Sequence, residues 1–135
     1  MKTIDVLLVE ALTDQAQTIA KSLQRQGLSV IVCDREQEAI NLLANNEFRI
    51  VVLAINEVSG PGQSIYKEFL VKYGTPPHCS TLVIAGTPEI KREWYASLAD
   101  RGHDVKIEIN KPYNIDELFS MIKRILKMQE QCHGA

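Results

Sequence analysis

The sequence predicts a single α/β domain in which five parallel strands alternate with five helices. Short, strongly apolar segments alternate five times with segments whose apolar residues recur at helical spacing. A strand covered on both faces reads as a nearly continuous apolar run, whereas a covering helix is apolar along one face only. Five such units indicate a doubly wound sheet with right-handed crossovers and helices on both faces. We expect the domain to span residues 1–128, followed by a polar tail or the start of a linker at 129–135.

The strand-like segments differ in a way that places them in the sheet. The third is the most hydrophobic of the five, which predicts the central strand. The fifth alternates apolar with polar side chains, as expected of a strand that turns one face toward water, and this predicts a sheet edge. The predicted strands are Ile4–Val9, Leu28–Cys33, Ile50–Ile55, Thr81–Ala85 and Val105–Asn110.

The intervening segments carry the periodicity and the end signals of helices. Apolar residues at helical spacing define the inward faces, and Gly27 is predicted to end the first helix. Four positions carry side chains that can accept a hydrogen bond from a first helical turn, which predicts N-caps at Thr13, Asp34, Thr87 and Asn114. The predicted inward residues of the first, second, third and last helices are Ala16, Ile19, Ala20 and Leu23; Ala39, Ile40, Leu42 and Leu43; Ile65, Phe69 and Leu70; and Ile115, Leu118, Phe119, Ile122 and Ile125.

Bulk composition argues against several classes of function. The net charge of −2 and the pI near 5.9 disfavour non-specific nucleic-acid binding, which needs a basic surface. No stretch reaches the roughly 18 apolar residues of a membrane span, and the N-terminus lacks the apolar core of a signal peptide. Cys33, Cys79 and Cys132 form an odd set without metal or disulfide spacing, which fits a reducing compartment. We therefore expect a cytoplasmic protein without direct nucleic-acid or membrane contacts.

Ligands of doubly wound sheets bind beyond the carboxyl ends of the strands, here residues 10–12, 54–59, 86–87 and 110–112. The turn that follows the first strand has no glycine for a pyrophosphate. Glu10 and Glu57 are the only carboxylates in these segments, fewer than a Mg²⁺ site requires. No nucleophile with a neighbouring base is visible. We expect no cofactor, no metal and no enzymatic activity.

Several short motifs follow one another in a specific order and spacing, although each alone is weak. They are Val6–Glu10, Gly27–Val30, Glu38–Leu43, Val51–Ile55 and Lys111-Pro112-Tyr113. In these motifs about residues 4–127 resemble the receiver domains of bacterial response regulators, the CheY-like family of two-component signalling. The resemblance implies the flavodoxin/CheY-like strand order 2-1-3-4-5 and a role in phosphorelay signal transduction.

The resemblance also assigns a phosphoryl-transfer site, and the sequence departs from it. The family's phosphoacceptor aspartate, at the end of strand three, corresponds to Ala54, which has no nucleophile. The acidic pair that holds Mg²⁺ in the family reads Glu10-Ala11, which leaves one carboxylate. The family's conserved lysine is matched by Lys111.

The two residues that switch conformation in the family are also replaced. The hydroxyl residue after strand four aligns with Gly86, although Thr87 follows it. The aromatic residue three positions before the lysine aligns with Glu108. The combined losses imply a pseudo-receiver that acts without phosphorylation, by binding a protein partner or a second copy of itself.

In the family, the face formed by helix four, strand five and helix five makes such contacts. The resemblance therefore suggests an interface that includes Trp94, Tyr95, Lys106 and Glu108. Ile90 and Leu98 could form a core face of this helix together with Trp94. A narrow helical stripe hardly buries two adjacent aromatic side chains, so one of Trp94 and Tyr95 is expected at the surface.

Two alternatives remain open at this point. The emptied acidic pocket could bind a small molecule, which would make the domain a sensor. Asn56 or Glu57 could serve as a non-standard phosphoacceptor. For Glu10 and Lys111 we expect an ion pair between strand ends, because a carboxylate beside the lysine competes with an incoming phosphate.

Overall fold

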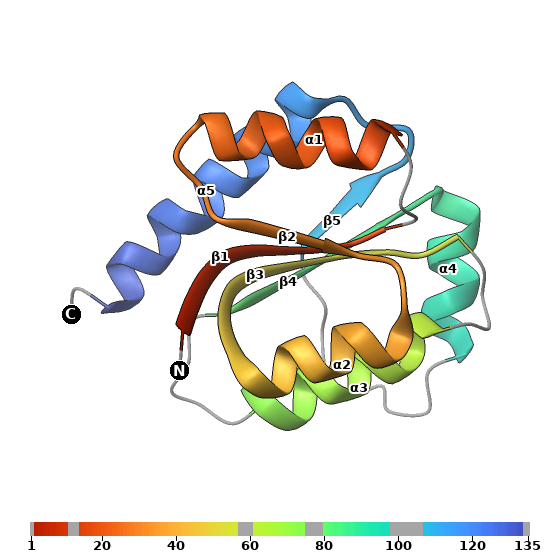
Figure 1. The fold of residues 1–135 in the computed structure, drawn as a ribbon. Coiled ribbons are helices and arrows are strands. Elements are labelled where there is room, and N and C mark those ends of the chain that lie inside the picture. The colour runs from red at the N-terminus through yellow and green to blue at the C-terminus, as the bar shows by residue number, and fades with distance from the viewer. Residues whose placement is uncertain (1, 11–13, 57–60, 75–79, 98–106, 134–135) are drawn as a thin grey trace.

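The sheet has five parallel strands, and their order confirms the prediction. The computed structural model describes residues 2–10, 14–56, 61–74, 80–97 and 107–133. The strands lie in the order β2-β1-β3-β4-β5, and each neighbouring pair is parallel (Figure 1). The strands are β1 (Lys2–Val9), β2 (Val30–Cys33), β3 (Asn46–Ala54), β4 (Thr81–Gly86) and β5 (Ile107–Asn110). The helices are α1 (Asp14–Arg25), α2 (Glu36–Asn45), α3 (Pro61–Tyr73), α4 (Pro88–Ser97) and α5 (Ile115–His133).

The helices cover both faces of the sheet, and each face has its own core. α1 and α5 lie on one face, and α2, α3 and α4 lie on the other (Figure 1). Because alternate side chains of a strand point to opposite faces, Val51 and Leu53 of β3 belong to one core, and Ile50 and Val52 belong to the other. All four are at most 1% exposed. This confirms β3 as the central, doubly buried strand.

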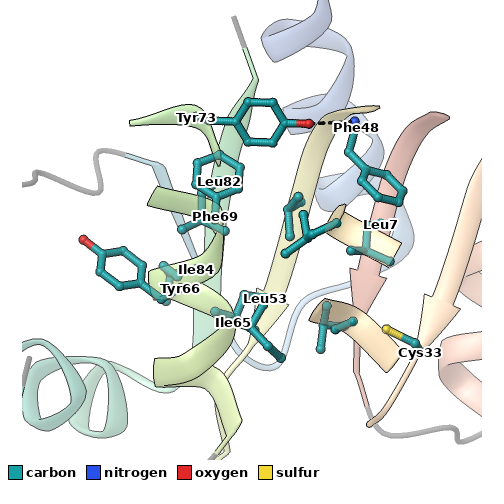
Figure 2. Close-up of a cluster of buried hydrophobic side chains, with 14 of the residues drawn as sticks. Leu7, Cys33, Phe48, Leu53, Ile65, Tyr66, Phe69, Tyr73, Leu82 and Ile84 are labelled. Atoms are coloured by element: carbon teal, nitrogen blue, oxygen red, sulfur yellow. Dashed lines mark hydrogen bonds between the residues drawn. The ribbon is translucent and has the colours of Figure 1, made fainter. Parts of the chain in front are cut away.

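The core beneath α2, α3 and α4 combines aliphatic and aromatic side chains from both strands and helices (Figure 2). Phe69 and Tyr73 of α3 pack with their ring centroids 5.0 Å apart. The Tyr73 hydroxyl accepts a hydrogen bond from the Phe48 backbone N–H at 3.1 Å and donates one to the Glu47 carboxylate at 3.0 Å. These bonds fasten the last turn of α3 to the beginning of β3.

Three of the predicted helix ends are confirmed. Gly27 has a φ of +92°, a left-handed conformation that favours glycine and ends α1. Asn114 Oδ1 accepts a hydrogen bond from the Glu117 N–H at 2.8 Å, and the Asn114 amide donates one to the Glu117 carboxylate at 3.1 Å. Thr87 Oγ1 accepts a hydrogen bond from the Ile90 N–H at 3.3 Å, so this threonine is the N-cap of α4.

The beginning of α2 differs from the prediction. α2 begins at Glu36, and its N-cap residue is Arg35, which forms no side-chain capping bond. The backbone at Arg35 is still extended, with φ −109° and ψ 137°, so Asp34 stands one residue before the capping position. The predicted Asp34 cap is therefore wrong. The predicted Thr13 cap lies outside the described residues.

The end of α5 also differs, because a polar side chain takes an inward position there. α5 continues to His133, so the polar tail predicted from Gln129 is wrong over residues 129–133. Gln129 follows the buried Ile125 by one helical turn and is itself only 8% exposed. Its amide donates to Arg49 O at 2.8 Å and to Thr81 Oγ1 at 3.1 Å. These bonds satisfy the buried amide and hold this part of α5 on β3 and β4.

Trp94 is a core residue of α4. Its side chain is 0% exposed, and its ring packs edge-on against Tyr66 of α3 with centroids 5.4 Å apart. Tyr95 is partly buried and packs edge-on against Trp94 at 5.5 Å. The prediction of Trp94 as an interface residue is therefore wrong, because this face of α4 is turned toward α3 and the sheet.

Trp94→Ala is expected to lower the free energy of unfolding by about 3–5 kcal/mol, because it leaves a large cavity between α3 and α4. Urea unfolding followed by circular dichroism measures this loss. Arg92→Ala is the matched control on the exposed side of the same helix, and its effect should stay within about 0.5 kcal/mol. A Trp94→Ala protein as stable as the wild type would contradict the buried position.

Candidate functional site

The carboxyl ends of the strands form a rim that backbone hydrogen bonds hold together. The parallel register pairs Ala54 with Ala85 and Gly86 with Asn110. Beyond the strands, Ile55 N donates to Ala85 O at 2.8 Å, and Lys111 N donates to Gly86 O at 2.9 Å. The rim segments that the sequence predicts to meet therefore do meet in the structure.

An ion pair crosses this rim from β1 to the segment after β5. Lys111 Nζ lies 2.9 Å from Glu10 Oε1 and 2.7 Å from Oε2, and the two side chains are 20% and 13% exposed. Lys111 Nζ also donates to Asn56 Oδ1 at 3.2 Å. The predicted ion pair between Glu10 and Lys111 is confirmed.

Tyr113 adds a further contact to the same carboxylate. Its hydroxyl donates to Glu10 Oε2 at 3.4 Å, and only 8% of the residue is exposed. Burial, and after it the negative charge of Glu10, raises the pKa of Tyr113 from 10.0 to about 12. The phenol therefore stays protonated and remains a hydrogen-bond donor at neutral pH.

A small pocket lies beside this ion pair, between α1 and the segment that leads into α5. It measures about 260 Å³, and its polar lining residues include Glu10, Gln15, Thr87 and Lys111. The charged groups in its wall neutralise each other, and Thr87 caps α4. Among the lining residues that the structure describes, the pocket therefore presents no uncompensated charge to attract an ionic ligand.

The position of Gly86 is sterically closed to a side chain. A Cβ atom added to Gly86 would lie 2.9 Å from Ile55 Cγ1, 3.1 Å from Ile55 O and 3.1 Å from Lys91 Cγ. Ile55 is 2% exposed and belongs to the core. The space that a serine or threonine would need at this point of the rim is therefore filled.

A second ion pair lies at the edge of the sheet, and the sequence did not predict it. Lys91 Nζ of α4 lies 3.0 Å from Glu108 Oε1 of β5, and Lys91 is only 7% exposed as a residue. Lys91 precedes the buried Trp94 by three positions and so shares its helical face. That spacing is the signal by which the sequence could have revealed it.

Of the predicted interface residues, two lie at this edge. The Glu108 side chain is 41% exposed, and Tyr95 is partly buried beside it. Burial, followed by the charge of Glu108, raises the pKa of the Tyr95 hydroxyl. Lys106 lies outside the described residues, as does Ala11 of the predicted pocket.

The buried Cys33 has no sign of chemical reactivity. It is 1% exposed at the end of β2, and burial, followed by the charges of Glu38 and Asp34, raises the pKa of its thiol from 9.0 to about 12. Thiol reactivity requires the thiolate, which is scarce at neutral pH when the pKa is so high.

Comparison with solved structures identifies the fold. The receiver domain of the Francisella response regulator 1452 is 23% identical with a TM-score of 0.68, and the match covers 93% of this chain and 98% of that chain. The fold is that of a response-regulator receiver domain. Further receiver domains match to a comparable extent. No family model and no curated protein sequence matches the chain.

Two other proteins share the receiver fold with this chain. One is an adenylate cyclase from Rhodopirellula baltica, 16% identical with a TM-score of 0.75, whose match covers 98% of this chain and 93% of that chain. The other is a redox sensor of the streptococci from a family that evolved from two-component response regulators. It is 19% identical with a TM-score of 0.75, and the match covers 99% of this chain and 55% of that chain.

The residues at the rim of this receiver fold do not fit a Mg²⁺ ion. Mg²⁺ requires several oxygen ligands with near-octahedral geometry, usually including one or two carboxylates. Glu10 supplies a carboxylate here, but both of its oxygens contact the Lys111 ammonium. Ala54 supplies no ligand, and Asn56 Oδ1 accepts from Lys111. Within the described residues, no group of three or more His, Cys, Asp or Glu side chains could hold a metal.

A search for membrane-spanning helices in the described ranges finds none that is long and apolar enough to cross a bilayer. The longest helix, α5, is amphipathic and carries charged residues along its length.

Lys111→Met is expected to destabilise the domain by about 2 kcal/mol, because it leaves the Glu10 carboxylate largely buried without its cation. Glu10→Gln should be milder, since the glutamine can still accept a hydrogen bond from Lys111. In the double variant the two losses should not add, and the coupling energy should be about 1 kcal/mol or more. Urea unfolding of the four proteins measures the cycle.

Lys127→Met removes an exposed lysine of α5 and serves as the control, with an effect close to zero. Strictly additive losses for Glu10 and Lys111 would mean that the ion pair contributes nothing to stability.

Proposed function

We propose that this chain is a receiver-fold signalling domain that works by binding a protein partner and carries out no phosphoryl transfer. The observation that carries the proposal is the set of side chains at the carboxyl ends of the strands. Ala54 stands where the resemblance places the phosphoacceptor, and Lys111 is already neutralised by Glu10 at 2.7 Å. At the described rim positions, the expected acceptor position thus offers no nucleophile, and Lys111 is not free to receive a transferred group.

Phosphoryl transfer needs a nucleophile, a metal ion and a cation that receives the group, and the described rim residues argue against each of them. A covalent intermediate needs an activated nucleophile, and a methyl group cannot act as one. Metal ions must neutralise the charge that develops in the transition state, and Glu10 is the only carboxylate at the described rim positions. An incoming phosphoryl group would also have to displace the Glu10 carboxylate from Lys111, and so compete with an ion pair that is already formed.

Asn56, considered above as a substitute acceptor, is engaged by Lys111 at 3.2 Å, and an amide is a poor nucleophile. Glu57 lies outside the described residues. The adenylate cyclase and the streptococcal redox sensors share only the fold with this chain, and fold alone does not determine function. We therefore propose a domain without catalytic activity.

The surface best suited to a partner is the face formed by α4, β5 and α5. Charged side chains of both signs are exposed there, including Arg92, Glu93 and Glu108. Tyr95 of α4 is partly buried beside Glu108. Aromatic residues are enriched in protein interfaces. Lys106 is proposed as part of the same face.

The absence of phosphoryl transfer can be tested with acetyl phosphate and Mg²⁺. Intact-mass analysis is expected to find no phosphoryl adduct on the wild-type chain, because Ala54 cannot accept the group and the described residues offer no metal site. The Ala54→Asp variant should also remain unmodified, since Ala11 and Gly86 still lack the second carboxylate and the hydroxyl. A stable adduct on the wild type would overturn the proposal, and an adduct on Ala54→Asp would show that only the acceptor is missing.

The interface can be tested by charge reversal. Arg92→Glu is expected to weaken self-association, or the complex with a protein encoded beside this one, by roughly an order of magnitude. Lys21→Glu on α1, in the other helical layer, should have no effect. Sedimentation velocity over a concentration series measures both variants. Equal association by Arg92→Glu and wild type would place the interface elsewhere.

A further inference from the structure

Lys91 is a buried lysine, and such a residue requires an explanation. Lysine is almost never fully buried without a partner, because removing the ammonium from water is unfavourable. Here the residue is 7% exposed, and its Nζ lies 3.0 Å from Glu108 Oε1. The Lys91 side chain is 9% exposed, whereas that of Glu108 is 41% exposed. The pair therefore joins α4 to β5 across the end of β4.

Gly86 provides the space through which the Lys91 side chain passes. A Cβ at this position would lie 3.1 Å from Lys91 Cγ, which is tighter than an ordinary contact. Among the described residues, Gly27 is the glycine with a positive φ, so the φ of Gly86 is not positive. Glycine at position 86 is thus explained by close packing and not by backbone conformation. A larger residue there would press against the side chain that reaches Glu108.

The three residues come from three consecutive elements that meet at the sheet edge. Glu108 pairs with Ile84 in the β4–β5 ladder, and Gly86 ends β4 two residues later. Lys91 lies in the first turns of α4, which begins directly after the Thr87 cap. Tyr95 lies one turn further along α4. Burial raises the pKa of the Tyr95 hydroxyl, and the nearby charge of Glu108 raises this pKa further. Glu108 therefore faces two successive turns of α4.

We propose that the Lys91–Glu108 ion pair holds α4 against the β4–β5 edge in one arrangement, and that Gly86 leaves the room that the Lys91 side chain needs. We call these three residues the ionic strut. By the resemblance, Gly86 and Glu108 occupy the positions of the two residues that move when a receiver domain is switched. In this chain the same two positions are engaged with Lys91. The α4–β5 part of the partner-binding face is then permanently formed and needs no activating signal.

This inference concerns the surface named in the proposed function and relies on that proposal for its biological meaning. Its physical content can be measured without a partner. Amide hydrogen exchange reports local opening of a segment, so the exchange of α4 amides measures how firmly the strut holds the helix. If this test fails, the results on phosphorylation and association are unaffected.

Lys91→Met keeps most of the aliphatic side chain and removes the charge, and Glu108→Gln keeps the shape and removes the charge. Each variant is expected to accelerate amide exchange in residues 88–97 by roughly tenfold, which corresponds to about 1.4 kcal/mol. The double variant should exchange no faster than the faster single variant, because the two substitutions break one interaction. Exchange in α2, residues 36–45, should stay unchanged.

Arg92→Met is the matched control, since it removes a neighbouring exposed charge from the same helix, and it should leave the α4 exchange rate unchanged. Gly86→Ala should also accelerate α4 exchange, because its Cβ would crowd both Ile55 and the Lys91 side chain. Wild-type exchange rates in Lys91→Met and Glu108→Gln, or fully additive effects of the two, would overturn the strut.

Discussion

The double burial of β3 is the constraint on which the rest of the structure depends. Ile50, Val51, Val52 and Leu53 are all withdrawn from water, with alternate side chains in two separate cores. A strand of this kind requires helices on both faces and parallel neighbours on both sides. Polar chemistry is then confined to the strand ends, where the chain leaves the core. The residues at these ends therefore determine what the domain can do, while the interior determines only that it folds.

At the strand ends, charge is neutralised within the molecule. Lys111 is bound by Glu10, and Lys91 is bound by Glu108. Both lysines are mostly covered, so each pairing avoids an isolated charge in a poorly hydrated place. An active phosphotransfer site has the opposite character, because it gathers carboxylates whose negative charge a bound metal ion neutralises, and it keeps a cation available for the incoming phosphoryl group. This difference supports a domain in which both lysines are already paired with carboxylates of the same chain.

The sequence predicts the architecture well because the architecture follows from patterns of hydrophobicity. Continuous apolar runs identify the inner strands, and the alternation that ends at Asn110 identifies the edge strand β5. The site is predicted less completely, because it depends on individual side chains. Lys91 was missed since a charged residue is ordinarily assigned to the surface, although its aliphatic portion can be buried while its ammonium reaches a partner.

The errors at Trp94 and Gln129 have related physical causes. Trp94 was assigned to an interface because two adjacent aromatic residues seemed too many for one face of α4. Its ring is accommodated because α3 contributes Tyr66 to the same contact, and this long-range packing has no local signal. Gln129 was assigned to a tail because it is polar, but its amide finds acceptors on β3 and β4. Partners supplied by distant segments are the information that a single sequence does not display.

The packing around Gly86 also limits how this domain can change over time. A single substitution of Gly86 by serine would bring the new Cβ within 2.9 Å of Ile55 Cγ1 and 3.1 Å of the Ile55 backbone oxygen. The backbone atom cannot move without disturbing the hydrogen bond from Ile55 N to Ala85 O. A serine or threonine at this position would therefore need compensating changes at Ile55 or Lys91. Close packing therefore holds this position at glycine, independently of any signalling role of the domain.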